Sequence, residues 1–338
     1  MTDRNAWTLP GTEEVAPGVH RIPLPLPNDG LRAVNVYAVA TEDGFVLIDA
    51  GWDIPESRTL LAQALDSLGA SLADIRRFLV THVHRDHYTQ AIVVRREFGA
   101  RVGLGIGEKP TLDSLQSPDR SPLMGQVEHL YVLGAPDLAE TISGFVRNAR
   151  PDFDQWESPD DWLEPGELAL PGGRVLEAVH TPGHTSGHLV FHDLAGSLLF
   201  AGDHVLPTIT PSIGFEPVLS PEPLGDFLRS LALVRSRPDA LLLPAHGAVT
   251  GSVHARVDEL VAHHGRRLDE IEAAARKGAE TAFEVACILR WTRRELMVSD
   301  LDPFNAMLAV SETGAHLALL AAQGRLTATD EDGVRHFR

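Results

Sequence analysis

The sequence predicts a layered α/β domain followed by a smaller, mainly helical C-terminal domain. Over residues 1–251, short apolar runs typical of strands alternate with amphipathic runs typical of helices. From residue 252 on, three helical runs and a hairpin signal replace that alternation. A chain of 338 residues is long for one compact domain and suits one large domain with a smaller one. We therefore predict domains at 1–251 and 252–338.

The elements of the α/β domain are predicted from periodicity and turn residues. Residues 31–40 and 44–51 are strand-like runs, separated by the turn residues Glu42, Asp43 and Gly44. Alternation of strands and helices places helices on the outer faces of sheets. The further predicted elements are helices at 56–70 and 91–100 and strands at 75–82, 101–106, 173–181, 187–193, 196–203 and 240–247.

A segment of weak periodicity interrupts this domain. Between about residues 108 and 165 prolines multiply, although residues 136–149 keep a helical pattern. We predict a helical insertion that serves as a lid or pocket wall. Its larger apolar side chains would either line a pocket for an acyl chain or pack helices together. They are Leu130, Tyr131, Phe153, Trp156 and Trp162.

The tail has the element order of a winged-helix domain. Helical runs occur at 253–278, 283–291 and 305–323, and Asp332-Gly333 is a strong hairpin signal in the last run. Three helices followed by a hairpin predict a winged-helix-like domain. The single cysteine, Cys287, lies in an apolar run of the second helix and is predicted to belong to the core.

Composition excludes several classes of protein. One cysteine permits neither an internal disulfide nor a cluster of thiolate ligands. No apolar run reaches the roughly 20 residues of a membrane helix, and the first residues lack the pattern of a signal peptide. A soluble cytoplasmic protein is therefore expected. The formal net charge of −18 disfavours nucleic acid as a partner, because the chain would repel a polyanion.

Residues 81–87 place three imidazoles and a carboxylate at the end of a predicted strand. Side chains alternate along a strand, so His82 and His84 share one side, while Asp86 and His87 follow where the chain can turn them toward a second centre. This spacing is typical of metal ligands rather than of an ordinary polar loop. Three later candidates also close or follow predicted strands. They are His184, Asp203 and His246.

This pattern resembles the metallo-β-lactamase superfamily over roughly residues 19–250. The family motif H-x-H-x-D-H is matched by His82, His84, Asp86 and His87. The next three ligand positions of the family are matched by His184, Asp203 and His246. The resemblance implies a four-layer αββα sandwich. It also implies that Asp49, in the stretch LIDAG, supports the metal-binding loop from behind.

The resemblance further implies how the ligands divide between two metal ions. One ion would take His82, His84 and His184. The other would take Asp86, His87 and His246, and Asp203 would bridge the two. Zinc is the default for imidazole and carboxylate ligands, with manganese or iron as alternatives.

Such an arrangement performs hydrolysis without a protein nucleophile. Two nearby cations lower the pKa of a shared water from about 15.7 toward 7, and one of them polarises the substrate oxygen. Asp86 would orient the resulting bridging hydroxide and relay its proton. Ser186 is therefore not expected to be catalytic. His188 and His204 are expected either to support the ligands or to have structural roles, and His192 is expected at the surface.

Two differences from other members of the superfamily reduce the number of reactions that this chain is expected to catalyse. Many zinc β-lactamases carry cysteine where this chain has Asp203, so antibiotic hydrolysis is not expected. Redox diiron members typically have Glu where this chain has His84, and no flavin-binding domain follows. The tail resembles, more weakly, the subgroup with a C-terminal winged helix, which includes ribonucleases and acyl-carrier-protein thioesterases. The residues that carry this second resemblance are His264, Arg267, Glu270 and Ile271, together with the stretch LALLAAQGRL. For His264 and Arg267, a solvated helix face or an interdomain contact is at least an equal interpretation.

Three hypotheses for function follow. The first is hydrolysis of a carboxylic thioester or ester, lactones included, with a small-molecule or acyl-carrier substrate. The second is cleavage of RNA, which the acidic composition disfavours. The third is a regulatory protein that binds DNA through its winged helix. The predicted helix at 305–323 contains no lysine or arginine, which favours interdomain packing or a homodimer over DNA binding.

Overall fold

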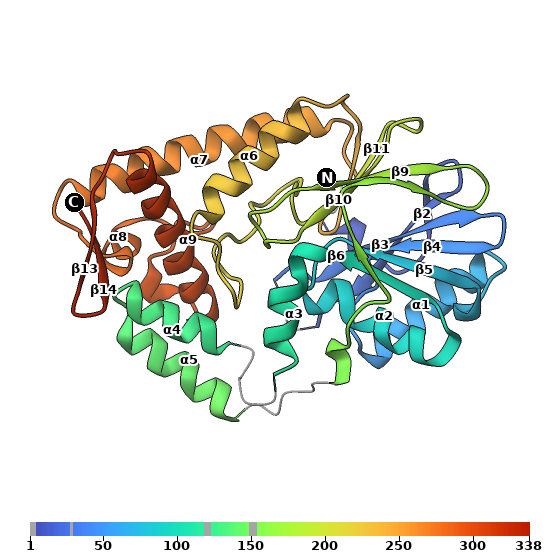
Figure 1. Cartoon of the computed structure of the whole chain (residues 1–338), viewed down its shortest axis with the longest axis horizontal. Coiled ribbons are helices and arrows are strands. Elements are labelled where there is room, and N and C mark those ends of the chain that lie inside the picture. Colours follow the sequence, from blue (N-terminus) through green and yellow to red (C-terminus); the bar gives the residue numbers. More distant parts are fainter. Residues whose placement is uncertain (1–4, 28–29, 118–122, 149–153) are drawn as a thin grey trace.

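The computed structural model describes residues 5–27, 30–117, 123–148 and 154–338 (Figure 1). Two sheets occupy one half of the molecule, and a group of helices with a terminal hairpin occupies the other. The long helix α7 (Val253–Ala275) runs from the sheets to the C-terminal helices. None of the described helices combines the length and apolar character that a membrane crossing needs.

The first sheet has seven strands in sequence order. They are β1 (Glu13–Ala16), β2 (Val19–Pro25), β3 (Ala33–Thr41), β4 (Gly44–Ile48), β5 (Ile75–Val80), β6 (Arg101–Gly105) and β7 (Asp161–Leu163). Pairing is antiparallel from β1 to β4 and parallel from β4 to β7. An apolar core joins one face of this sheet to three helices. They are α1 (Pro55–Ser67), α2 (Arg85–Phe98) and α3 (Lys109–Leu115).

The second sheet has five strands in the order β12-β11-β10-β9-β8. They are β8 (Gly166–Ala169), β9 (Val175–His180), β10 (Leu189–Asp193), β11 (Leu198–Gly202) and β12 (Leu241–Pro244). A core between the sheets includes Tyr37 and Phe200, whose ring centroids are 5.5 Å apart. A further core covers the outer face of this sheet with α6 (Pro223–Arg235) and α7. The layers are therefore helices, sheet, sheet and helices, as predicted.

The helices of the insertion and of the tail pack together. They are α4 (Met124–Val132), α5 (Pro136–Asn148), α8 (Ala282–Ile288) and α9 (Pro303–Ala322). The central helix α9 contacts α4, α5, α6, α7 and α8, and all of them share one apolar core. The hairpin of β13 (Ala328–Glu331) and β14 (Val334–Phe337) closes this part of the chain. Short 3-10 helices lie at Ala6–Thr8, Leu72–Asp74, Ile106–Glu108, Asp154–Trp156 and Val298–Asp300.

The predicted tail elements are present. Three helices and a hairpin follow residue 252, and Asp332 and Gly333 form the turn with positive φ angles of 50° and 84°. Cys287 is partly buried and packs against the core. A solvated helix face is wrong for His264, which is fully buried beside His316 on α9, with ring nitrogens 3.2 Å apart.

The structure corrects three predictions about elements. Strands β1 and β2 were both missed, and in β2 the two prolines, Pro23 and Pro25, are unusual inside a strand. Helix α2 begins at Arg85 rather than at residue 91, so the last part of the histidine motif, Asp86 and His87, lies on the helix. A carboxylate in the first turn, Asp86, favours that start through the helix dipole. His192 is buried, not exposed, because Arg237 covers it with its Nε 3.2 Å from His192 Nδ1.

The large apolar residues of the insertion do not form one wall among the described residues. Leu130 packs in the core of the C-terminal helices, whereas Trp156 and Trp162 pack against the helices of the first sheet. Tyr131 is exposed and donates a hydrogen bond to Glu140. The alternative interpretation, helix packing, therefore describes this set better. Phe153 lies outside the described residues.

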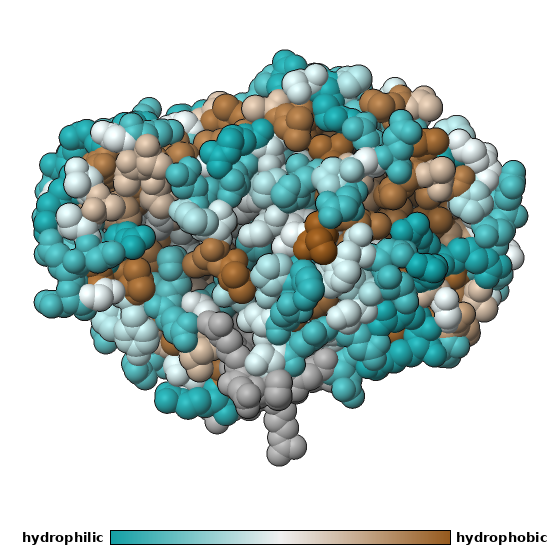
Figure 2. Space-filling model, viewed as in Figure 1, coloured by the Kyte–Doolittle hydropathy of each residue, from teal (hydrophilic) through white to brown (hydrophobic). Residues whose placement is uncertain are grey.

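The face of the molecule in Figure 2 is mostly hydrophilic. Hydrophobic residues appear there in separate groups with hydrophilic residues between them. This view does not identify a dimer interface, and the homodimer remains a prediction.

Candidate metal centre

Seven side chains meet where strands of both sheets end. The first four follow β5 and enter α2, so the turn between strand and helix brings them together. Another follows β9, and two more directly follow the parallel neighbours β11 and β12. Side chains at the carboxyl ends of adjacent strands meet at one edge of a sandwich. The seven are His82, His84, Asp86, His87, His184, Asp203 and His246.

Three of these side chains form one group. His84 Nδ1 lies 2.9 Å from His82 Nε2 and 3.2 Å from His184 Nε2. His82, His84 and His184 together can hold one cation, since their ring nitrogens face a common point.

Asp86, His87 and His246 form a second group. Asp86 Oδ2 lies 3.6 Å from His87 Nε2 and 3.4 Å from His246 Nε2. Asp203 stands between the two groups. Its Oδ2 lies 3.5 Å from His184 Nε2, and its Oδ1 lies 3.3 Å from His246 Nε2.

The residues present fit a bound cation. His87 Nε2, His246 Nε2 and Asp203 Oδ1 are buried, and none of them has a hydrogen-bond partner in the described part of the chain. A buried polar atom left unpaired costs about 1–3 kcal/mol, which a metal–ligand bond would remove. Imidazole nitrogens with carboxylate oxygens are the donor set of zinc and related divalent metals.

Asp49 holds this cluster from behind. It follows β4 with a φ of 60°, a strained conformation for a residue other than glycine. Its Oδ2 lies 2.9 Å from His87 Nδ1, and its Oδ1 accepts hydrogen bonds from the backbone N–H and the hydroxyl of Thr81. Asp49 therefore orients His87 and the start of the motif.

Backbone carbonyls orient two more rings. His184 Nδ1 donates to the carbonyl of Ser212, and His246 Nδ1 donates to the carbonyl of Ala33, each at 2.8 Å. Each bond fixes the tautomer, so Nε2 is the nitrogen without a proton that faces the cluster.

The two further histidines have different roles. His188 Nε2 accepts a hydrogen bond of 3.2 Å from the backbone N–H of Asp203, and its Nδ1 lies 3.0 Å from the hydroxyl of Thr181. His188 therefore supports Asp203. His204 is buried between the rings of His188 and Phe227, at centroid distances of 6.1 and 5.1 Å. Its contacts are those of a packing residue.

Two buried glutamates hold the loop that carries His184. Glu108 accepts a hydrogen bond from the hydroxyl of Thr185, and Glu216 accepts bonds from the backbone N–H and the hydroxyl of Ser186 at 2.6 and 2.7 Å. A Cβ at Gly187 would lie 2.1 Å from the backbone nitrogen of Glu108, so this approach requires glycine. Sequence reasoning missed both glutamates. The signal for Glu108 was its place just after β6, as Asp49 follows β4.

Burial dominates the electrostatics of the cluster. It lowers the pKa of His82 well below the usual value and, with the neighbouring His184, lowers that of His84 to about 3. Burial also opposes protonation of His87, but Asp86 and Asp49 outweigh it and raise the pKa of His87 to about 10. Neutral imidazoles thus form the first group, whereas the carboxylates around the second group stabilise the protonated form of His87.

The sequence comparison identifies the class of protein. Residues 29–246 match the metallo-beta-lactamase superfamily, and the chain belongs to this superfamily. It is similar to the probable metallo-hydrolase YqjP of Bacillus subtilis, with 26% identity over 94% of this chain and 96% of that protein. It is also similar to an atrochrysone carboxyl ACP thioesterase of Aspergillus novofumigatus, with 27% identity over 91% of this chain and 83% of that protein. The chain is a metallo-hydrolase.

Solved structures agree with this assignment. A metallo-beta-lactamase family protein from Thermus thermophilus superposes with a TM-score of 0.77 and 27% identity, over 95% of this chain and 99% of that one. A beta-lactamase domain protein from Burkholderia ambifaria gives a TM-score of 0.80 and 28% identity, over 96% and 93% of the two chains. The resemblance therefore extends through the C-terminal helices.

Proposed function

We propose that this hydrolase cleaves a carboxylic thioester or ester, lactones included, at a centre of two divalent metal ions. The position of Asp203 carries the dinuclear assignment, because its two oxygens face the two separate groups of ligand-capable side chains. We assign zinc as the metal, with manganese or iron as alternatives, on the chemistry of the donors.

Bound divalent ions would supply Lewis acidity and lower the pKa of a shared water. The chain itself supplies a general base and an accessible side from which the substrate can reach the centre. Asp86 and His84 are partly exposed, whereas the other five proposed ligands are buried, so substrate approaches over these two side chains. Asp86 is then the carboxylate placed to accept a proton from the attacking water and to deliver it to the leaving group. The Ser186 backbone N–H and hydroxyl both donate to Glu216, a contact that holds the loop, and the proposed chemistry requires no serine nucleophile.

The surroundings support an acyl substrate. Phe215, from the loop after β11, lies with its ring 6.3 Å from that of His84. Phe304, at the start of α9, lies 5.5 Å from Phe215 and is 45% exposed. These rings give an acyl chain an apolar surface beside the proposed centre. The thioesterase named among the relatives acts, by its name, on an acyl carrier protein, which supports the thioester within this class.

We also infer that residues 252–338 form the winged-helix-like domain. Its third helix, α9, is unsuited to a DNA groove because five other helices surround it. The packing of the insertion on α9 supports a different role, in which this domain holds Phe304 beside Phe215.

The test compares two substrates with one enzyme preparation. We expect a far higher kcat/KM for a medium-chain acyl thioester than for single-stranded RNA. Asp203→Ala should lower thioester turnover by more than about 100-fold, since even residues behind metal ligands cost 10–100-fold when changed. Circular dichroism should show an intact fold.

Two variants serve as controls. Asp66→Ala removes an exposed aspartate of α1, and Cys287→Ser removes the only thiol. Both should retain full activity. Efficient RNA cleavage that disappears in Asp203→Ala, without turnover of any thioester or ester, would replace this proposal with a ribonuclease.

A further inference from the structure

Four arginines without carboxylate partners gather on one part of this acidic chain. Most described arginines form ion pairs with Asp or Glu. In the region formed by α7 and the turn after α8, by contrast, four exposed guanidinium groups have no carboxylate within ion-pair distance among the described residues. They are Arg266, Arg290, Arg293 and Arg294.

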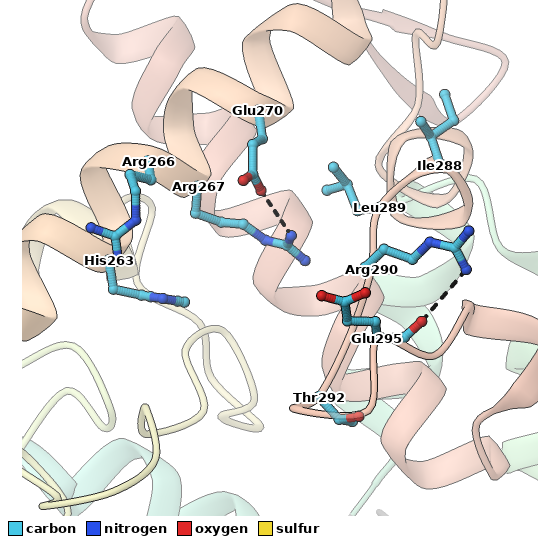
Figure 3. Close-up of a pocket in the computed structure, with 9 residues that line it drawn as sticks. All are labelled: His263, Arg266, Arg267, Glu270, Ile288, Leu289, Arg290, Thr292 and Glu295. Atoms are coloured by element: carbon cyan, nitrogen blue, oxygen red, sulfur yellow. Dashed lines mark hydrogen bonds and ion pairs between the residues drawn. The ribbon is translucent and has the colours of Figure 1, made fainter.

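Two of these arginines line a pocket of about 590 Å³. In Figure 3, His263, Arg266 and Arg267 project from α7 on one side, and Arg290 and Thr292 lie on the other. The volume is in the range of pockets that hold small ligands.

The walls of the pocket are fixed by internal contacts. The Arg267 guanidinium stacks 4.2 Å from the ring of Trp291 and bonds to Glu270 at 3.1 Å. The indole N–H of Trp291 donates to the carbonyl of Ala286 at 2.9 Å. Within the part of the chain that the structure describes, Arg290 makes one long contact, of 3.5 Å with the backbone carbonyl of Glu295, so its charge remains available to a ligand.

The pocket lining includes three guanidinium groups, of Arg266, Arg267 and Arg290, against two carboxylates, of Glu270 and Glu295, so its charge favours an anion over a cation. His263 belongs to a ligand-capable trio with His264 and Glu312, whose ligand atoms lie within 4.8 Å of one another. Burial lowers the pKa of His263, and the charges of Arg267 and Arg266 lower it further. The same charges would repel a metal ion. Guanidinium groups are the side chains best suited to bind a phosphate through paired N–H donors.

One loop connects this pocket with the proposed metal centre. Arg293, next to the pocket residue Thr292, donates to the carbonyl of Thr208. Thr208 is five residues beyond Asp203 in the sequence, which limits their Cα separation to about 18 Å. Farther along the same loop, Ser212 accepts the hydrogen bond that orients His184.

We propose that the pocket binds the phosphate of a phosphopantetheine thioester, so that the pantetheine arm leads to the proposed centre and places the acyl carbonyl there. This inference rests on the proposed thioesterase function. A local cluster suits one or two phosphate groups. A polyanion would need a longer track of free cations, whereas most of the other arginines are neutralised by ion pairs and the chain carries a net charge of −18. The phosphate comes from coenzyme A or from a holo-carrier protein, which share this arm.

The experiment uses a matched pair of substrates, octanoyl-pantetheine and octanoyl-4′-phosphopantetheine, which differ only in the phosphate. The double variant Arg266→Gln/Arg290→Gln should raise KM for the phosphorylated substrate at least about 10-fold, because it removes two guanidinium groups that would donate charge-assisted hydrogen bonds to the phosphate. Its kcat should stay within about twofold, and octanoyl-pantetheine should be hydrolysed as by the parent. The matched control is Arg229→Gln, an exposed arginine of α6 that is already paired with Asp226.

Octanoyl-coenzyme A and an octanoyl carrier protein, tested in the same way, identify the source of the phosphate. Direct binding of 4′-phosphopantetheine, measured by calorimetry, separates the two proposals. If binding is lost in the double variant but no thioester is hydrolysed by the parent, the pocket is supported and the thioesterase function is wrong. Equal binding by parent and double variant, or equal KM values for the matched substrates in the parent, would overturn the pocket. Loss of RNA affinity in the double variant, with thioester kinetics unchanged, would overturn it in favour of RNA.

Discussion

Glu108 is a carboxylic acid placed where water does not reach it. Burial and the neighbouring Glu216 raise its pKa from 4.5 to about 8. Between these two values the folded chain holds a proton that the unfolded chain releases, so rising pH favours unfolding across that window. At about 1.4 kcal/mol per pH unit, raising the pH from 6 to 8 costs the folded state roughly 2 kcal/mol at this one residue.

Glu108→Gln should remove that dependence, because glutamine carries no proton to release. Relative to the parent, the variant is expected to gain roughly 2 kcal/mol in free energy of unfolding between pH 6 and pH 8. Urea unfolding at the two pH values, in the same metal state, measures it. Glu167→Gln, an exposed site on β8, is the control and should show no such gain. A constant difference between variant and parent at both pH values would contradict the prediction.

The candidate metal ligands were predictable where they lie close together in the sequence. His82, His84, Asp86 and His87 stand within six positions, so the spacing alone indicated a cluster. Contacts between distant residues were not predictable in this way. Glu216 reaches Ser186 across 30 positions, and His192 is buried by an arginine 45 positions away.

The terminal hairpin contributes a large apolar side chain to the core of the C-terminal helices. Phe337 on β14 is 1% exposed, and its backbone N–H donates to the carbonyl of Glu280 at 2.7 Å. The hairpin therefore joins the turn before α8 to the helices around α9.

Phe337→Ala should lower the free energy of unfolding by about 3–5 kcal/mol, the usual cost of removing a buried aromatic ring. The control, Arg335→Ala on the same strand, breaks an exposed pair with Asp330 and should cost less than about 1 kcal/mol. Chemical denaturation of both variants gives the comparison. Similar losses for the two would show that the hairpin does not stabilise the core.

Elements were predictable where periodicity was regular. The strands that precede the ligands and the helices of the tail follow the apolar pattern. The start of α2 was wrong because the motif residues before Tyr88 are polar and carry no apolar repeat. The segment β2, which carries two prolines, was not predicted as a strand, although it pairs with β3 along its whole length.

The proposed ligands follow strands of both sheets, so the centre depends on the packing of the two sheets against each other. We expect about two ions per chain when protein is purified without chelator, because the side chains form two groups around Asp203. Elemental analysis gives the number. Chelation should lower Tm, since a ligand that binds only the folded chain stabilises it by mass action. Preparations that stay free of metal after incubation with zinc, manganese or iron would refute the centre.

The alternation of elements predicted a layered α/β domain, and the family resemblance implied the order of its layers. The packing of the insertion on α9 was not, because helices α4 and α5 are more than 150 positions away from it in the sequence. The contact between Phe215 and Phe304, whose rings lie 5.5 Å apart, likewise joins residues that are 89 positions apart in the sequence. Apolar periodicity predicts that a helix has a buried face, but it does not predict which distant helix packs against that face.

The hydrogen bond between His246 and the carbonyl of Ala33 has a consequence for biosynthesis. It joins an early strand of the first sheet to the residue that completes the set of proposed ligands, more than 200 positions later. When the histidines after β5 have been synthesised, the nascent chain still lacks His246, which follows β12. If the proposed centre is correct, its full complement of ions would be acquired only when translation of the α/β domain is nearly complete, and a truncated product ending before residue 246 should release metal that the finished protein retains.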